Sequence, residues 1–223
     1  MKTLEIGMLL FPRITQLDLT GPFEVLSRLS ACRVHLIWKS LDPVTSDSGL
    51  GMLPTTTFAA CPQLDVVLVP GGPGQIPLME DQEVLEFLRI QSVGAQYMTS
   101  VCTGSLVLGA AGLLRGYRAA CHWMSRDLLS EFGAEPVADR IVCDRDRITG
   151  GGVTAGIDFA LILAARLRSE AEAQAIALQL EYRPAPPFAI DAPELEAMLR
   201  ARAAGLMELR RTAVERARRA LGT

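Results

Sequence analysis

The stretch AQYMTSVCTGSLVLGAAG, residues 95–112, decides the fold because it joins a strand, a sharp turn and a buried helix. The β-branched and aromatic residues of 97–101 are typical of a strand. Residues 106–111 are apolar on all sides, which is typical of a helix buried in a core. Cys102 lies at the junction. The order of strand, nucleophile, small residue and helix is that of a nucleophile elbow.

A cysteine at such a junction is suited to covalent chemistry. The positive end of a helix dipole and the unpaired N–H groups there favour the thiolate, so we expect a lowered pKa for Cys102. The small residues Thr103, Gly104 and Ser105 are expected to keep the thiol accessible. The N–H of Thr103 is placed to serve an oxyanion hole. The alternative interpretation is a buried structural cysteine.

Outward from this stretch, strand-like and helix-like segments alternate, which predicts one α/β domain with a mainly parallel sheet. Strands are expected at 4–10, 34–40 and 65–69, with short strands and turns over 44–58 and a hairpin over 141–149. Helices are expected at 17–29, 81–92, 125–132 and 155–168, with another beginning near Ser169 and a last one near Pro193. Thr154 is expected to cap the helix over 155–168.

Three turns follow predicted parallel strands: Gly71-Gly72, Cys102, and Gly150 with Gly151 and Gly152. The carboxyl ends of parallel strands form the usual site of an open α/β sheet, so we expect these turns to converge. Asp18, after the first strand, is expected in the same crevice.

Asp18 is the best candidate for an acid. A protonated carboxyl beside a thiolate can donate a short hydrogen bond and then act as general acid or base. The other interpretation is an exposed carboxylate that interacts favourably with the start of a helix.

Other polar candidates are weaker. The turn PGGPG, residues 70–74, lacks both the phosphate-loop and the dinucleotide pattern, so no nucleotide cofactor is expected. Its glycines are either a plain turn or a means of pointing the N–H of Gly72 into the pocket beside Thr103. His122 either lines the pocket or satisfies a hydrogen bond in the core. His35 alternates with apolar residues in a strand and is interpreted as structural.

Composition favours a small-molecule partner. The chain has 223 residues, of which 49% are hydrophobic and 21% charged, and its net charge is −3. The acidic balance argues against nucleic acid or an anionic membrane as the main partner. No segment is long and apolar enough for a membrane span, and the first residues lack the features of a signal peptide, so a cytoplasmic protein is expected. The five cysteines and two histidines show no spacing typical of disulfides or of a metal site.

Several motifs in order resemble the DJ/PfpI superfamily, which includes PfpI-type proteases, parkinsonism-associated DJ-type proteins and glutamine-amidotransferase-like domains. They are QLDLTGPFEVL, LDVVLVPGGPG, TSVCTGSLVLGAAGLL, HWMSRDLL, TGGGVTAGIDFAL and QLEYRPAPPF, spread from about residue 4 to 188. The motifs are most similar to the branch that hydrates isonitriles.

This resemblance implies a flavodoxin-like sandwich and a homodimer with active sites near the subunit interface. It implies that Cys102 is the nucleophile, Asp18 its acidic partner and Thr103 a hydroxyl important for hydration, with Gly72 supplying an N–H on the oxyanion side. The implied reaction adds water to an isonitrile and gives an N-substituted formamide. No cofactor or metal is implied.

Departures from other branches narrow the choice. Protease-like members have histidine directly after the cysteine, where this chain has Thr103, and amidotransferases use a histidine downstream, where this chain has none after His122. The remaining alternatives are a glyoxalase or deglycase, and a redox or stress sensor that uses the same cysteine.

The C-terminal residues are expected to form a helical extension, 191–223, packed on a domain of residues 1–190. From Pro193 onward the chain has seven arginines and four glutamates among regularly spaced apolar residues. This pattern predicts one amphipathic packing helix, since no nucleic-acid recognition motif accompanies the arginines.

Overall fold

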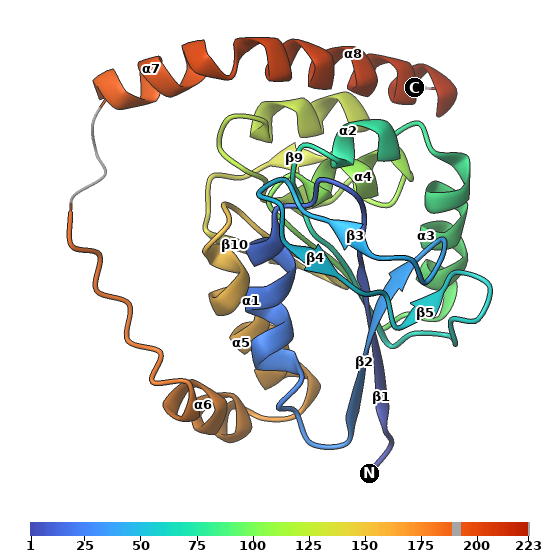
Figure 1. Cartoon of the computed structure of the whole chain (residues 1–223), viewed down its shortest axis with the longest axis vertical. Helices are drawn as coiled ribbons and strands as arrows, with labels where there is room; N and C mark the ends of the chain where they lie inside the picture. Colours follow the sequence, from blue (N-terminus) through green and yellow to red (C-terminus); the bar gives the residue numbers. More distant parts are fainter. Residues whose placement is uncertain (189–192, 223) are drawn as a thin grey trace.

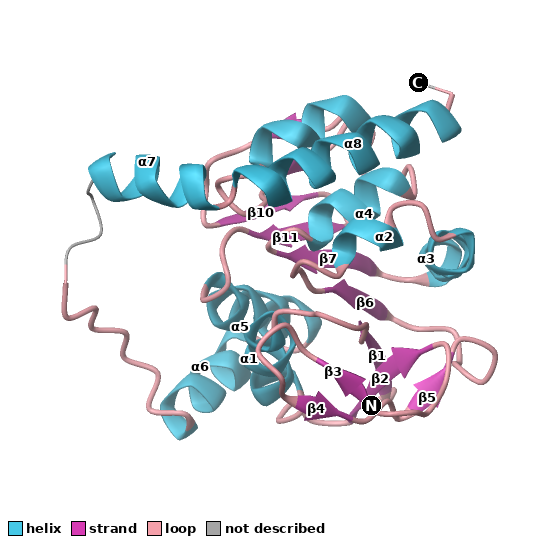
Figure 2. Ribbon diagram, turned by 45° about the horizontal axis from the view of Figure 1, so that its top comes forward, coloured by secondary structure: helices cyan, strands magenta, loops and turns pink. Residues whose placement is uncertain are grey.

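A seven-stranded sheet runs through the centre of the protein, as seen in a computed structural model that describes residues 1–188 and 193–222 (Figures 1 and 2). Its strand order is β10-β11-β7-β6-β1-β2-β5, and all neighbours pair in parallel except the β10–β11 hairpin. The strands are β1 (Leu4–Leu9), β2 (Cys32–Trp38), β5 (Thr56–Thr57), β6 (Val66–Val69), β7 (Tyr97–Val101), β10 (Ile141–Asp144) and β11 (Arg147–Gly150).

Two small two-stranded sheets lie outside the central one. They pair β3 (Val44–Thr45) with β4 (Gly51–Met52), and β8 (Arg118–Ala119) with β9 (Glu135–Pro136).

The inner strands are buried on both faces, as in parallel sheets covered by helices. Every residue of β6, sequence VVLV, is buried, and so are the last four residues of β7. The five strands β2-β1-β6-β7-β11 have the order 2-1-3-4-5 of flavodoxin-like sheets. The predicted fold class is therefore confirmed. The order reverses between β1 and β6, which is where such sheets bind ligands.

Helices cover both faces of the sheet (Figure 2). One layer holds α1 (Gln16–Leu26), α5 (Ala155–Leu167) and α6 (Glu170–Gln179). The other holds α2 (Gln75–Leu78), α3 (Gln82–Gly94), α4 (Gly104–Ala110) and the 3₁₀ helix η1 (Arg126–Phe132). Helices α1 and α5 approach closely because of Gly156, where an added Cβ would lie 3.0 Å from Pro22 Cδ.

Most predicted elements are confirmed, although residues 126–132 form a 3₁₀ helix and the start of α5 differs in detail. Thr154 occupies the N-cap position of α5 but its side chain makes no capping hydrogen bond. Its hydroxyl lies 3.5 Å from Nη2 of Arg140, which also bonds to the Thr154 carbonyl at 3.0 Å. The side chain is therefore held by a neighbouring arginine instead of the helix.

The prediction of one C-terminal packing helix is confirmed only in part, because the chain from Pro193 onward forms two helices and only the second has buried residues. Two helices form, α7 (Pro193–Arg202) and α8 (Ala204–Ala220), and α7 buries no residue. The buried stripe of α8 consists of Arg210, Ala213, Val214 and Ala217, whereas the apolar Leu209 is 63% exposed. Large apolar residues were expected to pack, but small ones do so because α8 lies close against α2, α4 and η1.

The predicted domain boundary between residues 190 and 191 lies outside the described residues. Of the helices in the described part of the chain, none has the length and apolar character that crossing a bilayer requires.

Candidate active site

The three predicted turns meet at the carboxyl ends of β6, β7 and β11. The N–H of Cys102 donates to the carbonyl of Gly150 at 3.1 Å, which joins two of the turns. The N–H of Gly71 donates to Oδ2 of Asp18 at 3.0 Å, which joins the third turn to α1. The structure thus brings together the thiol, the carboxyl and both glycine turns in one buried cluster at the strand ends.

Cys102 has the backbone geometry of a nucleophile elbow. Its φ is +59°, a left-handed conformation that is rare for a residue with a side chain. Such strain is held in place by the surrounding structure and concentrates at functional sites. Here the hydrogen bond to Gly150 and the buried helix α4 hold it.

The thiol is buried, which corrects two expectations. Cys102 is 5% exposed and Thr103 3% exposed, so the small residues of the turn do not leave the sulfur open. Burial raises the pKa of Cys102 well above its ordinary value, and the negative charge of Asp18 raises it further. The Thr103 N–H lowers it, but loss of water outweighs this helix-end effect. A thiolate here needs a group to receive its proton.

Asp18 is suited to be that group. Its side chain is completely buried, so the interpretation of an exposed helix-start carboxylate is wrong. Burial raises the pKa of Asp18 to about 7, against the lowering effects of the Cys102 thiol and the Gly71 N–H. Oδ1 has no well-formed hydrogen bond to the described residues. Near neutral pH, Asp18 can therefore both accept and donate a proton.

Thr103 lies beside this pair, and two glycines allow its approach. Its Oγ1 accepts the N–H of Gly72 at 3.1 Å, so its own proton remains free to be donated elsewhere. Gly72 has a φ of +128°, and its N–H is engaged by Thr103 instead of pointing into open space. A Cβ at Gly71 would lie 2.6 Å from the Thr103 nitrogen and 2.8 Å from Oδ2 of Asp18. Only glycine lets these groups meet.

A chain of buried hydroxyls ties the elbow to the segment that precedes His122. The hydroxyls of Ser100 and Ser105 lie 2.8 Å apart, and Ser105 donates to the carbonyl of Ala120 at 2.6 Å. The N–H of Ala120 donates to Thr149 Oγ1 at 2.8 Å. Strands β7 and β11 thus fix the position of this segment.

His122 is half-buried on the segment that follows β8. Its Nδ1 accepts the N–H of Met124 at 3.4 Å, and its ring centroid lies 5.8 Å from that of Trp123. Burial and the positive charge of Arg210 lower its pKa, so the imidazole is neutral at pH 7. The other histidine, His35, lies on β2 with Nε2 2.6 Å from Glu5 Oε2 and takes no part in the site.

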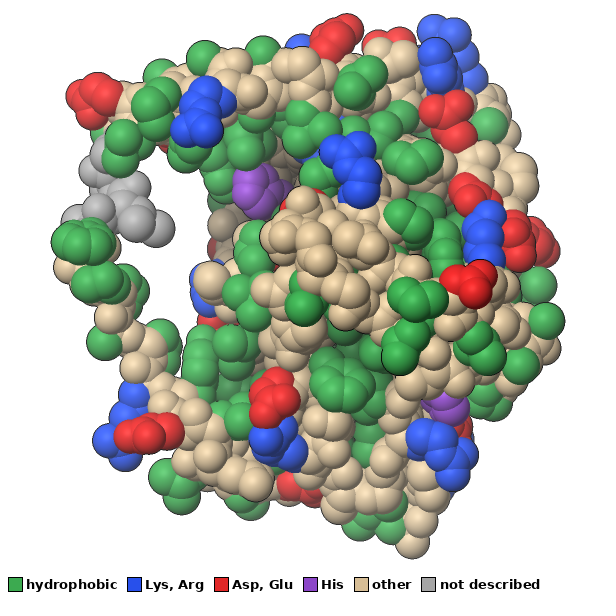
Figure 3. Space-filling model, in the orientation of Figure 1, with side chains coloured by type: hydrophobic (Ala, Val, Ile, Leu, Met, Phe, Trp, Pro, Cys, Tyr) green, Lys and Arg blue, Asp and Glu red, His purple; other side chains and the backbone are tan. Residues whose placement is uncertain are grey.

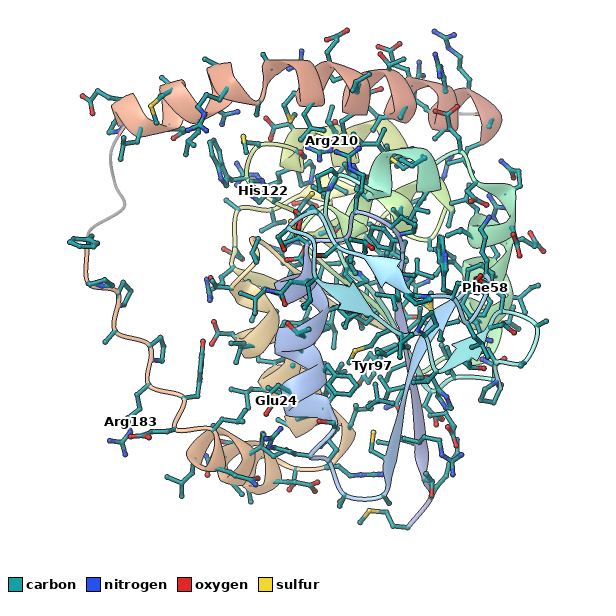
Figure 4. The ribbon with its side chains drawn as sticks, in the orientation of Figure 1. Glu24, Phe58, Tyr97, His122, Arg183 and Arg210 are labelled. Carbon is teal, nitrogen blue, oxygen red and sulfur yellow. The ribbon has the colours of Figure 1, made fainter. Side chains whose placement is uncertain are left out.

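Sequence reasoning missed two buried residues near the nucleophile, Cys121 and Arg210. Burial raises the pKa of Cys121 to about 12, with the charge of Arg210 lowering it. Arg210 projects from α8 toward the protein body, and His122 lies nearby (Figure 4). A signal for Arg210 was present: its spacing from Ala213, Val214 and Ala217 places it on the small-residue face of the helix.

Within residues 1–188 and 193–222, no cluster of three histidine, cysteine or acidic side chains is arranged to hold a metal ion.

A buried cysteine at a strained elbow, paired with a buried carboxyl, agrees with the result of the family comparison. The model of the DJ-1/PfpI family matches residues 5–166. The chain belongs to the DJ-1/PfpI family. This match includes Asp18, Gly71, Gly72, Cys102, Thr103 and His122, and it ends before α8.

Three relatives place the chain within this family. It is 57% identical to an isonitrile hydratase of Pseudomonas putida over 219 residues, which cover 96% of each chain. The crystal structure of a ThiJ/PfpI family protein from Pseudomonas syringae superposes with a TM-score of 0.93 at 42% identity, covering 96% of this chain and 91% of that one. A glutathione-independent glyoxalase of Caenorhabditis elegans is 29% identical over 124 residues, covering 55% of this chain and 66% of its own.

Proposed function

We propose that this protein is an isonitrile hydratase, a lyase that adds water to an isonitrile and releases an N-substituted formamide. The 57% identity to the Pseudomonas putida hydratase along nearly all of both chains carries the proposal. The site supports it, because a thiol and a carboxyl that can exchange one proton are what this addition needs.

In the first step, sulfur attacks and one proton moves. The Asp18 carboxylate takes the proton of the Cys102 thiol as the sulfur bonds to the terminal carbon of the isonitrile. Asp18 then gives that proton to the same carbon. The product is a thioimidate, in which carbon carries hydrogen and sulfur and is doubly bonded to nitrogen.

In the second step, water releases the product. Asp18 takes a proton from water as the oxygen bonds to the thioimidate carbon, and then passes it to the nitrogen. The carbon–sulfur bond breaks as the carbonyl forms, and the remaining hydroxyl proton returns to sulfur. One isonitrile and one water thus give one formamide and the free thiol.

The neighbouring groups place the water and the adduct. The Thr103 hydroxyl accepts from Gly72 and keeps its proton available for the water or the adduct nitrogen. This hydrogen bond occupies the Gly72 N–H, so Gly72 acts on the substrate only by holding the Thr103 hydroxyl in place. The neutral imidazole of His122 is suited to line the site beside a substrate without charge.

A homodimer belongs to the same proposal. The superfamily resemblance implies it, and a groove on α1, α5 and the end of α6 offers a surface for it, lined in part by the apolar residues Leu17, Val25, Ile157 and Leu180. Hydrophobic side chains are exposed on this side of the molecule (Figure 3). Light scattering coupled to size exclusion should give twice the 24.1 kDa chain mass. A monomer at micromolar concentration would contradict this part of the proposal.

The deciding experiment follows formamide formation from a simple aromatic isonitrile at neutral pH. The Cys102→Ala variant and a parallel reaction with methylglyoxal serve as controls. Formamide that depends on Cys102 supports the hydratase. Lactate from methylglyoxal without formamide would assign the protein to the glyoxalases. Inactivity on both, with ready oxidation of Cys102, would favour a sensor.

A further inference from the structure

Arg210 is a buried cation with neutral partners. It is 5% exposed, and its Nη1 donates to Ser125 Oγ at 2.9 Å and lies 3.3 Å from Met207 Sδ. Its Nε is buried with no hydrogen-bond partner among residues 1–188 and 193–222. Within the same residues, no carboxylate lies within 4.0 Å of the guanidinium.

A guanidinium in such a place needs a compensating charge. Removing a cation from water costs several kcal/mol after relaxation. Hydrogen bonds to a hydroxyl and a thioether recover part of this, but they carry no net charge. Arg210 interacts favourably by charge with Cys121 and Cys102 when either is a thiolate.

The active site carries a matching negative charge. Asp18 and Cys102 together hold one proton when Asp18 is ionised, or when the thiolate forms and Asp18 is neutral. In either arrangement the pair has a net charge of −1. No cation among the residues that the family model matches is paired with Asp18 or Cys102. Arg126, on the 3₁₀ helix, belongs to these residues but acts on Cys121 instead.

We infer that Arg210, supplied by the C-terminal helix α8, is the counter-cation of the single negative charge shared by Asp18 and Cys102. This role rests on the proposed function of Cys102 as the nucleophile. Arg210 acts on the pair by its charge, so it is a positioning residue. Ser125 anchors it to the segment of His122, because Ser125 accepts a hydrogen bond from Arg210 and its own N–H donates to the carbonyl of His122 at 2.8 Å.

The consequence is that the field of Arg210 stabilises the anionic form of the pair during attack. Other ionisable groups act on the same region. Asp47, in the turn between β3 and β4, acts on Asp18, and Cys121 acts on Cys102. Arg126 of η1 acts together with Arg210 on Cys121, and Arg210 also acts on His122.

Alkylation of Cys102 tests this charge without an isonitrile. The neutral reagent iodoacetamide and the anionic iodoacetate are compared across pH, and modification is measured on the peptide that contains residue 102. In the wild-type protein, the ratio of iodoacetate to iodoacetamide rates should exceed that of a neutral model thiol, because a positive field attracts the anion. A ratio equal to or below that of the model thiol would overturn the inference.

Variants separate charge from structure. Arg210→Gln keeps hydrogen-bond donors but removes the charge, so the pH midpoint of alkylation should rise by about one unit. At pH values below both midpoints, this shift lowers the alkylation rate about tenfold. Arg210→Lys keeps the charge and should stay near the wild-type midpoint. Arg211→Gln, on the same helix but exposed, should not move it.

The outcomes are distinct from failure of the hydratase proposal, because alkylation needs no substrate. Arg210→Gln with an unchanged midpoint and reagent ratio would contradict the inference, and so would an equal shift in Arg210→Lys. Should Arg210→Gln not fold, the reagent ratio of the wild-type protein and the midpoint of Arg210→Lys still decide. Formamide kinetics on the same proteins then show whether the shift reaches turnover.

Discussion

Asp18 and Arg210 are both buried charged residues with an unsatisfied polar atom, yet they come from different parts of the chain. Asp18 lies in the strand-end crevice, within the residues that the family model matches. Arg210 lies on α8, outside that match. The comparison teaches that the shared fold holds the groups proposed to bond and move protons, whereas the C-terminal helix adds a charge to them.

The largest effect should come from the crevice itself. Cys102→Ser replaces the proposed nucleophile with a hydroxyl that Asp18 activates poorly, so formamide formation should fall by a factor on the order of 10⁴ or more. Cys143→Ser, on β10 away from the elbow, is the matched control and should keep its rate. A Cys102→Ser protein with more than a tenth of the wild-type rate would contradict covalent catalysis.

The second largest effect should come from removing the acid, Asp18. Asp18→Asn keeps the shape and the bond from Gly71 but cannot carry a proton, so kcat should fall by about 10²–10⁴-fold. Because Asp18 must be ionised to receive the thiol proton, wild-type kcat/KM should rise with pH through about 7. The variant should lack this limb, whereas the exposed Asp127→Asn should retain it. The same limb in Asp18→Asn would assign it to another group.

Ionisation of the Asp18 carboxyl should make the folded protein less stable as pH rises. Its pKa is about 7 in the folded protein and 3.8 in its ordinary state, so the folded state disfavours the charged form. Below the ordinary pKa this group has no effect. Between pH 4 and 7 the unfolded chain loses the proton first, which lowers the free energy of unfolding by up to about 4 kcal/mol above pH 7.

Asp18→Asn should therefore be more stable than the wild type at pH 8 and similar at pH 4. Urea unfolding at the two pH values measures this difference. A variant that is as stable as the wild type at pH 8, or less stable, would show that ionisation of Asp18 does not destabilise the folded protein.

A smaller effect is expected from crowding the crevice. In Gly71→Ala, the new Cβ would lie 2.6 Å from the Thr103 nitrogen and 2.8 Å from Asp18 Oδ2, so these groups must move apart. The cost should be about 1–3 kcal/mol of stability, with a loss of activity. Gly152→Ala, where an added Cβ meets nothing within 4 Å, is the matched control. Thermal unfolding and formamide assays on both variants measure the difference.

The crevice could be predicted from sequence because each of its parts follows a strand. Apolar runs before Gly71 and Cys102 mark parallel strands, and the fold brings the ends of such strands together. The pKa of Cys102 could not be predicted in this way. It depends on how completely the layers exclude water, and this tertiary property outweighs the local effect of a helix end.

The C-terminal region was harder to predict because its apolar residues are misleading. Leu195, Met198 and Leu199 suggest a packing face, yet all three are exposed on α7. The face that packs carries alanines, a valine and Arg210. Small side chains lie on this face because α8 closely approaches η1 and α2. Sequence periodicity shows which residues share a face, but only the fold shows which face is covered.

The smallest effect is expected where α7 touches the body of the protein. The guanidinium of Arg200 lies 4.5 Å from the ring centroid of Trp123, beside His122, but half of its side chain is exposed. Arg200→Ala should therefore cost about 0.5–1 kcal/mol of stability, the usual worth of an exposed cation–π contact. Formamide kinetics should change by less than about twofold, since Arg200 places no charge inside the crevice. A larger loss of turnover would mean that α7, and not α8 alone, completes the site.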